Sequence, residues 1–89
     1  MTRKEKSLLS KLAKGDFVLT LHARERMSQR FITEEDIVYV AKRAKNIRYQ
    51  VEPATFLIEG HTEWKENLFI SVAYRNEVII VTVFFEEPI

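Results

Sequence analysis

Three side chains that could bind and cleave a phosphodiester are spaced for one face of a helix. His22, Arg26 and Arg30 recur every fourth residue, and at about 100° per residue they form a narrow polar stripe. Guanidinium groups match phosphate oxygens, and imidazole is the side chain that exchanges protons most readily near neutral pH. Cleaving RNA without a metal ion needs a base for the 2′-hydroxyl, a cation for the phosphorane and an acid for the leaving group. His22 and Arg26 are therefore candidate catalytic residues, and Arg30 is a candidate substrate contact.

The stripe also has a purely structural interpretation. It borders the apolar face of the predicted helix, where arginines must be satisfied because burying them unpaired costs free energy. Arg26 and Arg30 would then pair with sheet carbonyls or with carboxylates of the second half of the chain. The candidate carboxylates are Glu59 and Glu77. His22 would in that case cap the helix N-terminus, and the sequence leaves both interpretations open.

The other candidate site residues lie on either side of this segment or beyond it. His61 is the only other histidine and could supply the second acid–base group, although a loop histidine can equally be a solvated side chain. Tyr74 and Arg75 close a predicted strand at a turn, where they either contact phosphate or are ordinary rim residues. Arg24 is a further candidate substrate contact. Two histidines without a third ligand do not make a metal site, so we expect neither a metal ion nor a cofactor.

The charge of the chain is unevenly distributed. The total is only +1, but residues 1–48 hold 12 basic and six acidic side chains, a net +6. Residues 49–89 hold two basic side chains and seven glutamates, a net −5. If the halves stay apart in space, the basic half favours an anionic partner such as RNA. The alternative is that the opposite charges cancel within the fold.

Trp64 lies in the segment His61–Asn67, which carries more acidic than basic side chains. Such surroundings do not favour RNA stacking, so we expect Trp64 to belong to a protein interface or to the packing.

Composition narrows the class of protein further. The 89 residues fit one domain, and the absence of cysteine excludes a disulfide framework and a thiolate nucleophile. The longest apolar stretch, Val78–Phe85, is eight residues with one threonine, whereas a membrane helix needs about 20. With no signal peptide visible either, we expect a cytoplasmic protein without a membrane partner.

A helical first part and a stranded second part must position these residues. Residues 1–46 show helical periodicity, with a capping box at Thr2, and residues 47–87 show strand periodicity. The predicted helices begin near Thr2, Leu21 and Thr33, and the predicted strands cover Ile47–Val51, Thr55–Glu59, Leu68–Tyr74 and Val78–Phe85, with a short extended piece at Phe17–Leu19. We expect an α+β fold in which two to three N-terminal helices pack on one face of a four-stranded antiparallel sheet (α-α-α-β-β-β-β). Because Val78–Phe85 is nearly all β-branched or aromatic, we expect it to be a central strand covered on both faces.

The segment His22-Ala23-x-x-Arg26-Met27-x-x-Arg30, followed by Phe31-Ile32-Thr33, resembles the opening of a small bacterial domain-of-unknown-function family. Members of that family typically contain H-A-x-x-R-M-x-x-R-G-I-[ST]-x-x-x-[IV]. The resemblance extends from about Leu19 to Phe85, and it departs at Phe31, where the family usually has glycine. The family is similar to BrnT-like and RelE/ParE-like toxins, so the resemblance implies helices on an antiparallel sheet and cleavage of messenger RNA.

Three functions are compatible with these observations. The first is an RNA-binding, toxin-type ribonuclease, and the second is a non-catalytic module that binds a cognate protein partner. The third is a DNA-binding module, which the sequence disfavours because Glu34, Glu35 and Asp36 stand at the helix end that would enter the groove. The oligomeric state does not follow from the sequence.

Overall fold

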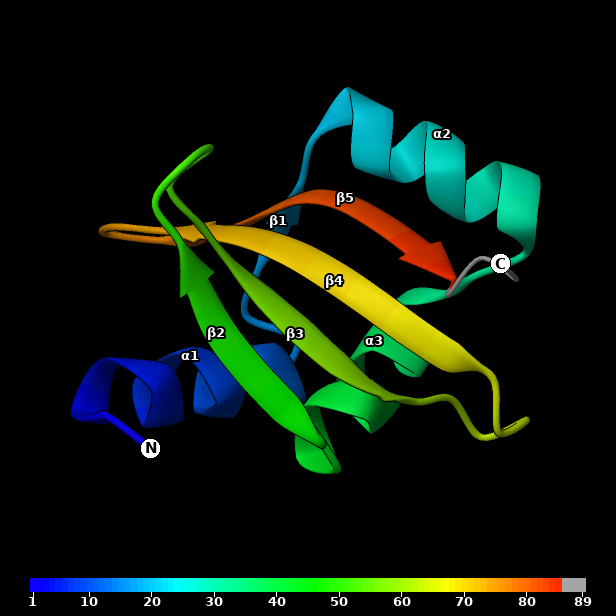
Figure 1. Ribbon diagram of the computed structural model, residues 1–89. Helices are drawn as coiled ribbons and strands as arrows, with labels where there is room; N and C mark the ends of the chain where they lie inside the picture. The colour runs from blue at the N-terminus through cyan, green and yellow to red at the C-terminus, as the bar shows by residue number, and fades with distance from the viewer. Residues whose placement is uncertain (86–89) are drawn as a thin grey trace.

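The computed structural model describes residues 1–85, which form three helices and a five-stranded mixed sheet (Figure 1). In chain order the elements are α1 (Arg3–Ala13), β1 (Val18–Leu19), α2 (Leu21–Arg30), α3 (Glu34–Lys42), β2 (Asn46–Gln50), β3 (Thr55–His61), β4 (Asn67–Tyr74) and β5 (Val78–Phe85). Helix gives way to strand at Asn46, next to the predicted boundary, and the last two residues of the predicted stranded part, 86 and 87, lie outside the described residues. Within residues 1–85, no helix is long and apolar enough to cross a membrane.

Each helix begins after a threonine whose hydroxyl accepts a hydrogen bond from a backbone N–H of the first turn. The donors are Glu5 to Thr2 (3.1 Å), Ala23 to Thr20 (3.0 Å) and Asp36 to Thr33 (3.1 Å). In α1 and α3 the carboxylate at the third helical position accepts in return from the N-cap N–H, which confirms the capping box predicted at Thr2. The hydrogen bond from the Thr2 N–H holds the pKa of the Glu5 carboxyl below its ordinary value.

The sheet has the strand order β1-β5-β4-β3-β2, and only β1 and β5 are parallel. Thr20 fixes this parallel contact, because its N–H donates to the Ile80 carbonyl (3.1 Å) and its hydroxyl to the Val81 carbonyl (2.8 Å). The prediction of four antiparallel strands is therefore wrong by one strand: the extended piece at Phe17–Leu19 supplies a fifth, parallel one. Two paired residues are too few to show a strand period, so only the tertiary contact with β5 reveals this strand.

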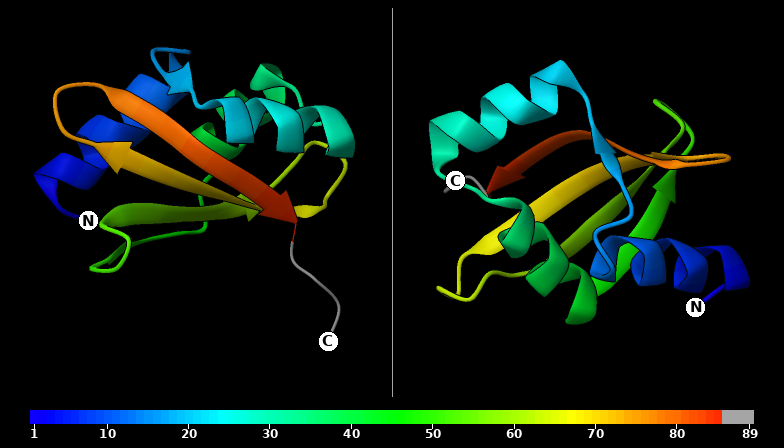
Figure 2. Two further views of the ribbon diagram at one scale, coloured as in Figure 1. Left: turned by 90° about the horizontal axis from the view of Figure 1, so that it is seen from above. Right: turned by 180° about the vertical axis from the view of Figure 1, so that it is seen from behind.

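All three helices lie on one face of the sheet, as the view from above in Figure 2 shows, and this part of the prediction is confirmed. The core between helices and sheet is formed by apolar side chains that include Leu8, Leu12, Ala23, Met27, Ile37, Val40, Ile58, Ile70, Val72, Ile80 and Val83. Along β5, Ile80 and Val83 are fully buried against the helices, whereas Ile79 and Phe84 are only partly buried. The expectation that this strand is covered on both faces is therefore wrong. Its second apolar face is partly shielded by a neighbouring strand instead, since Phe69 stacks on Phe84 at 5.1 Å.

Gly60 allows α3 to lie close against β3. A Cβ atom at this position would stand 3.0 Å from Cγ1 of Val40, a side chain that is fully buried. Just beyond α3, the Lys45 N–H donates to the Glu59 carbonyl at 2.8 Å. The close approach brings the C-terminal end of α3 to the end of β3, where His61 lies.

Candidate anion-binding site

His61 is the last residue of β3, and a short loop built around Thr62 follows it. Thr62 is only 4% exposed, and its hydroxyl accepts hydrogen bonds from the N–H groups of Trp64 (3.3 Å) and Glu66 (3.2 Å). Its carbonyl accepts from the N–H of Lys65, which adopts the left-handed conformation at φ 66°. These bonds hold the loop in one shape while the side chains of Trp64 and Lys65 remain exposed.

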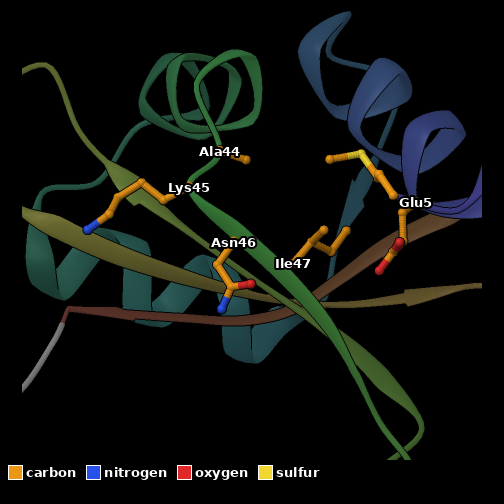
Figure 3. A pocket seen from close by; sticks show the side chains of 6 residues that line it. Glu5, Ala44, Lys45, Asn46 and Ile47 are labelled. Atoms are coloured by element: carbon orange, nitrogen blue, oxygen red, sulfur yellow. The ribbon is translucent and has the colours of Figure 1, made fainter.

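The C-terminal end of α3 places basic side chains next to His61 and the loop that follows it. Arg43 caps the helix, and its guanidinium carbon lies 4.0 Å from the centre of the Tyr39 ring. Such a cation–π contact holds the guanidinium without neutralising it. Lys45 borders a neighbouring hollow at the N-terminal end of α1, and Figure 3 shows its side chain directed away from Glu5 in that hollow.

Together these elements form a pocket of about 280 Å³, which we call the basic pocket. It is lined by Tyr39, Arg43, Lys45, His61, Thr62, Glu63 and Lys65. Three basic side chains and one imidazole line the pocket with a single carboxylate, and the only ion pair within residues 1–85 is elsewhere, between Lys11 and Asp16. The basic pocket therefore has the charge and the donor groups to hold a phosphate.

The stripe on α2 is accessible. His22 and Arg30 are exposed, Arg26 is partly buried, and none of the three forms an ion pair within residues 1–85. Neither Glu59 nor Glu77 forms an ion pair with these arginines, and Glu59 instead accepts a hydrogen bond from the Asn67 amide at 2.7 Å. His22 does not cap α2, because Thr20 is its N-cap. The structural interpretation of the stripe as a set of ion pairs and a cap is therefore wrong for the described chain.

The structure does not bring all the candidate residues together. His61 lines the basic pocket, and neither His22 nor Arg26 is among the residues lining it. His61 pairs with Asn67 at one end of β4, while Tyr74 ends that strand seven residues on, about 23 Å away at strand spacing. A role for His22 and Arg26 in one centre with His61 stays a prediction.

The remaining candidates have other surroundings. The Tyr74 hydroxyl is 2.7 Å from Oγ of Ser7, and its ring lies 5.7 Å from Nζ of Lys4, so it connects α1 to the sheet. Arg75 lines a separate hollow of about 370 Å³ at the turn between β4 and β5. Arg24 is exposed on α2.

Sequence reasoning missed four of the residues that surround His61. Tyr39, Arg43 and Lys45 belong to the C-terminal part of α3 and the residues after it. Basic side chains there are expected in any helix, because they interact favourably with the negative end of the helix dipole, so their presence did not indicate a ligand. Lys65 stands among acidic neighbours in the chain. Only the topology could have indicated these neighbours of His61, since a helix packed on β3 would end beside the end of that strand. Among residues 1–85, the structure contains no group of three or more His, Asp or Glu side chains that could hold a metal ion.

Fold and site together define a small α+β protein with helices on one face of a mixed sheet and a basic pocket at one end of it. Residues 19–85 match the family described as Domain of unknown function (DUF4258), and the chain belongs to this family. The predicted membership in a small family of unknown function is thereby confirmed. Searches of curated proteins and of solved structures gave no significant match.

Proposed function

We propose that this protein is an RNA-binding, toxin-type ribonuclease of the BrnT/RelE kind, and that RNA binds and is cleaved in the basic pocket. The observation that carries the proposal is that Arg43, Lys45 and Lys65 line the same pocket as His61. Basic side chains bind phosphate oxygens through charge-assisted hydrogen bonds, and a histidine can transfer a proton to or from a reacting group, so this set of side chains suits a phosphodiester. The accessible arginines of α2 provide further phosphate contacts.

The chemistry needs only the substrate and these side chains. His61 removes the proton from a ribose 2′-hydroxyl, and the 2′-oxygen forms a bond to phosphorus as the bond from phosphorus to the 5′-oxygen breaks. Arg43 and Lys45 stabilise the extra negative charge of the phosphorane. The Lys65 ammonium group protonates the leaving 5′-oxygen. The products are a 2′,3′-cyclic phosphate and a 5′-hydroxyl, so atoms and charge balance without an added oxidant or metal.

The test is cleavage of a short, unstructured, fluorescein-labelled RNA by the purified protein in buffer containing EDTA. The expected result is a 2′,3′-cyclic phosphate product, with a rate that falls by a factor of about 100 or more in His61→Ala. His22→Ala is the matched control, since it removes the chain's other imidazole outside the basic pocket. Cleavage that depends on His22 and not on His61 would place the reaction on α2 and overturn the assignment to the basic pocket.

Expression in a growth-sensitive bacterial host tests the toxin character separately. Growth arrest by the wild type and its relief by His61→Ala would support the proposal. No growth arrest, together with no binding of the labelled RNA, would leave the second candidate function, a non-catalytic protein-interaction module. That candidate is favoured by two exposed aromatic side chains, Phe31 and Trp64.

A further inference from the structure

A second hollow lies on the other side of Tyr39 and Glu63 from the basic pocket, and two large apolar side chains border it. Phe31 is 90% exposed and Trp64 is 76% exposed, the two highest values among the aromatic residues recorded as exposed in residues 1–85. The hollow has a volume of about 340 Å³. We call it the aromatic hollow, and its lining residues are Phe31, Thr33, Glu35, Asp36, Tyr39, Glu63 and Trp64.

The side chain of Phe31 is exposed to solvent because the neighbouring residues determine the backbone conformation at this position. It ends α2 in the left-handed conformation, with φ 57° and ψ 36°. The next residue, Ile32, enters the core at 5% exposure, and its N–H donates to the Met27 carbonyl at 2.9 Å. Glycine suits such a helix end best, and a bulky residue there carries a conformational cost. Phe31 thus combines an unfavourable backbone with an exposed ring, and the fold gains no core packing in return.

The charges around the two rings are negative. Glu35, Asp36 and Glu63 line the aromatic hollow, and no basic side chain does. Asp36 is already engaged, since its carboxylate accepts from the Thr33 N–H at 2.8 Å. Glu35 and Glu63 are exposed and form no ion pair within residues 1–85. An arginine or lysine side chain placed between them would be attracted by both carboxylates and by the faces of the rings.

We propose that the aromatic hollow binds a basic, apolar-flanked segment of a protein partner, with one arginine or lysine of that segment inserted between Phe31, Trp64 and the two free carboxylates. The apolar flanks of the segment cover the rings, and the cation neutralises Glu35 and Glu63. RNA does not fit this description, because its phosphates would face carboxylates. This inference does not depend on the ribonuclease activity proposed for the basic pocket.

A second copy of this chain is a poorer occupant than a peptide segment. The basic pocket of a second copy is itself concave, and two hollows that face each other leave both unfilled. A hollow of this kind is filled by a protruding side chain, which an extended segment can offer.

The single tryptophan of the chain makes the test direct, because fluorescence excited at wavelengths that tyrosine does not absorb reports on Trp64 alone. The probes are three capped pentapeptides with alternating leucines: Leu-Arg-Leu-Arg-Leu, the same peptide with glutamines, and the same with glutamates. The expected result is a saturable change of Trp64 fluorescence with the arginine peptide only. Equal responses to the three peptides, or no saturable response to the arginine peptide, would overturn the proposal.

Variants then locate the binding. Phe31→Gly removes one ring while keeping a residue that suits the backbone, and it should weaken binding of the arginine peptide about tenfold. Glu35→Gln/Glu63→Gln should weaken it about tenfold as well. The matched control Glu25→Gln/Glu77→Gln removes two exposed carboxylates that do not line the hollow, and it should change the affinity less than about twofold.

Two outcomes of the variant series contradict the proposal. Equal affinity in Phe31→Gly and in the wild type would show that the peptide binds elsewhere. A wild-type dimer in sedimentation experiments that Phe31→Gly dissociates, with no peptide binding, would assign the hollow to contacts between copies of this chain instead.

Discussion

The basic pocket and the aromatic hollow share Tyr39 and Glu63 and are otherwise opposite in character. The basic pocket is lined by three basic side chains and an imidazole, and the aromatic hollow is lined by three carboxylates and two exposed aromatic rings. Their residues do not follow the division of charge along the sequence. Glu35 comes from the positive half of the chain but lines the acidic hollow, and Lys65 comes from the negative half but lines the basic pocket. Net charge by sequence segment therefore says little about net charge by surface region once α3 and the loop after β3 pack together.

The largest expected effect comes from reversing the charge of the basic pocket. Arg43→Glu/Lys65→Glu should lower the affinity for single-stranded RNA about 100-fold at low salt. The negative slope of log K against log salt should become shallower by about 1.4, at about 0.7 per phosphate contact of a single strand. The double substitution removes two contacts to phosphates and the positive charge that surrounds His61. Fluorescence anisotropy of a labelled RNA at several salt concentrations measures both quantities.

The stripe on α2 provides the matched control for this charge reversal. Arg26→Glu/Arg30→Glu changes the net charge by the same amount and should weaken binding only about tenfold, because these arginines border no part of the basic pocket. If the stripe reversal is the more damaging of the two, RNA binds mainly along α2 and the contrast between the two hollows has no bearing on RNA.

Gly60→Ala should disturb both hollows at once. The added methyl group would meet the buried Val40 side chain at 3.0 Å and push α3 away from β3, which should lower the free energy of unfolding by about 1–2 kcal/mol. Because α3 carries Tyr39, a residue of both hollows, RNA affinity and arginine-peptide affinity should fall together. Chemical denaturation and the two binding assays check this, and a loss confined to one hollow would show that they are positioned independently.

The parts of the fold that local sequence determines were predictable. Apolar residues at helical spacing, with helix starts at Thr2 and Thr33, indicated the helices, and runs of alternating, β-branched or aromatic residues indicated the four longer strands. The parallel strand β1 was not predictable, because it has two residues and exists only through its contact with β5. The coverage of β5 was misjudged for a related reason. Its apolar outer face is shielded by a stack between Phe69 and Phe84, which depends on strand register.

The candidate site divides in the same way. The spacing of His22, Arg26 and Arg30 correctly placed them on one face of a helix, since helical geometry alone determines it. That this face is accessible follows only from the structure. The neighbours of His61 come from α3 and from the loop after β3, and their proximity depends on Gly60 and on the turn around Thr62. Tertiary contacts of this kind leave no periodic pattern in a single sequence.

A smaller effect is expected at Tyr74, which lies about 23 Å along the sheet from the basic pocket. Tyr74→Phe removes a hydroxyl that is 2.7 Å from Oγ of Ser7, and it should lower the free energy of unfolding by about 1 kcal/mol. RNA affinity should stay within error of the wild type. A clear loss of RNA affinity without a loss of stability would restore Tyr74 as a substrate contact and extend the RNA site to the far end of the sheet.

The smallest change in stability, and the most informative about the aromatic hollow, is expected from Phe31→Gly. Glycine adopts the left-handed conformation at φ 57° without a side-chain clash, and this gain is partly offset by the larger entropy of glycine in the unfolded chain. The free energy of unfolding should therefore rise by about 0.5 kcal/mol, as measured by urea denaturation. Since the ring is 90% exposed, no core packing is lost with it. A variant that is more stable, binds RNA like the wild type and binds the arginine peptide about tenfold more weakly would separate the two hollows. A decrease in stability would mean that the ring packs against the folded chain, and its exposure would then no longer argue for a partner.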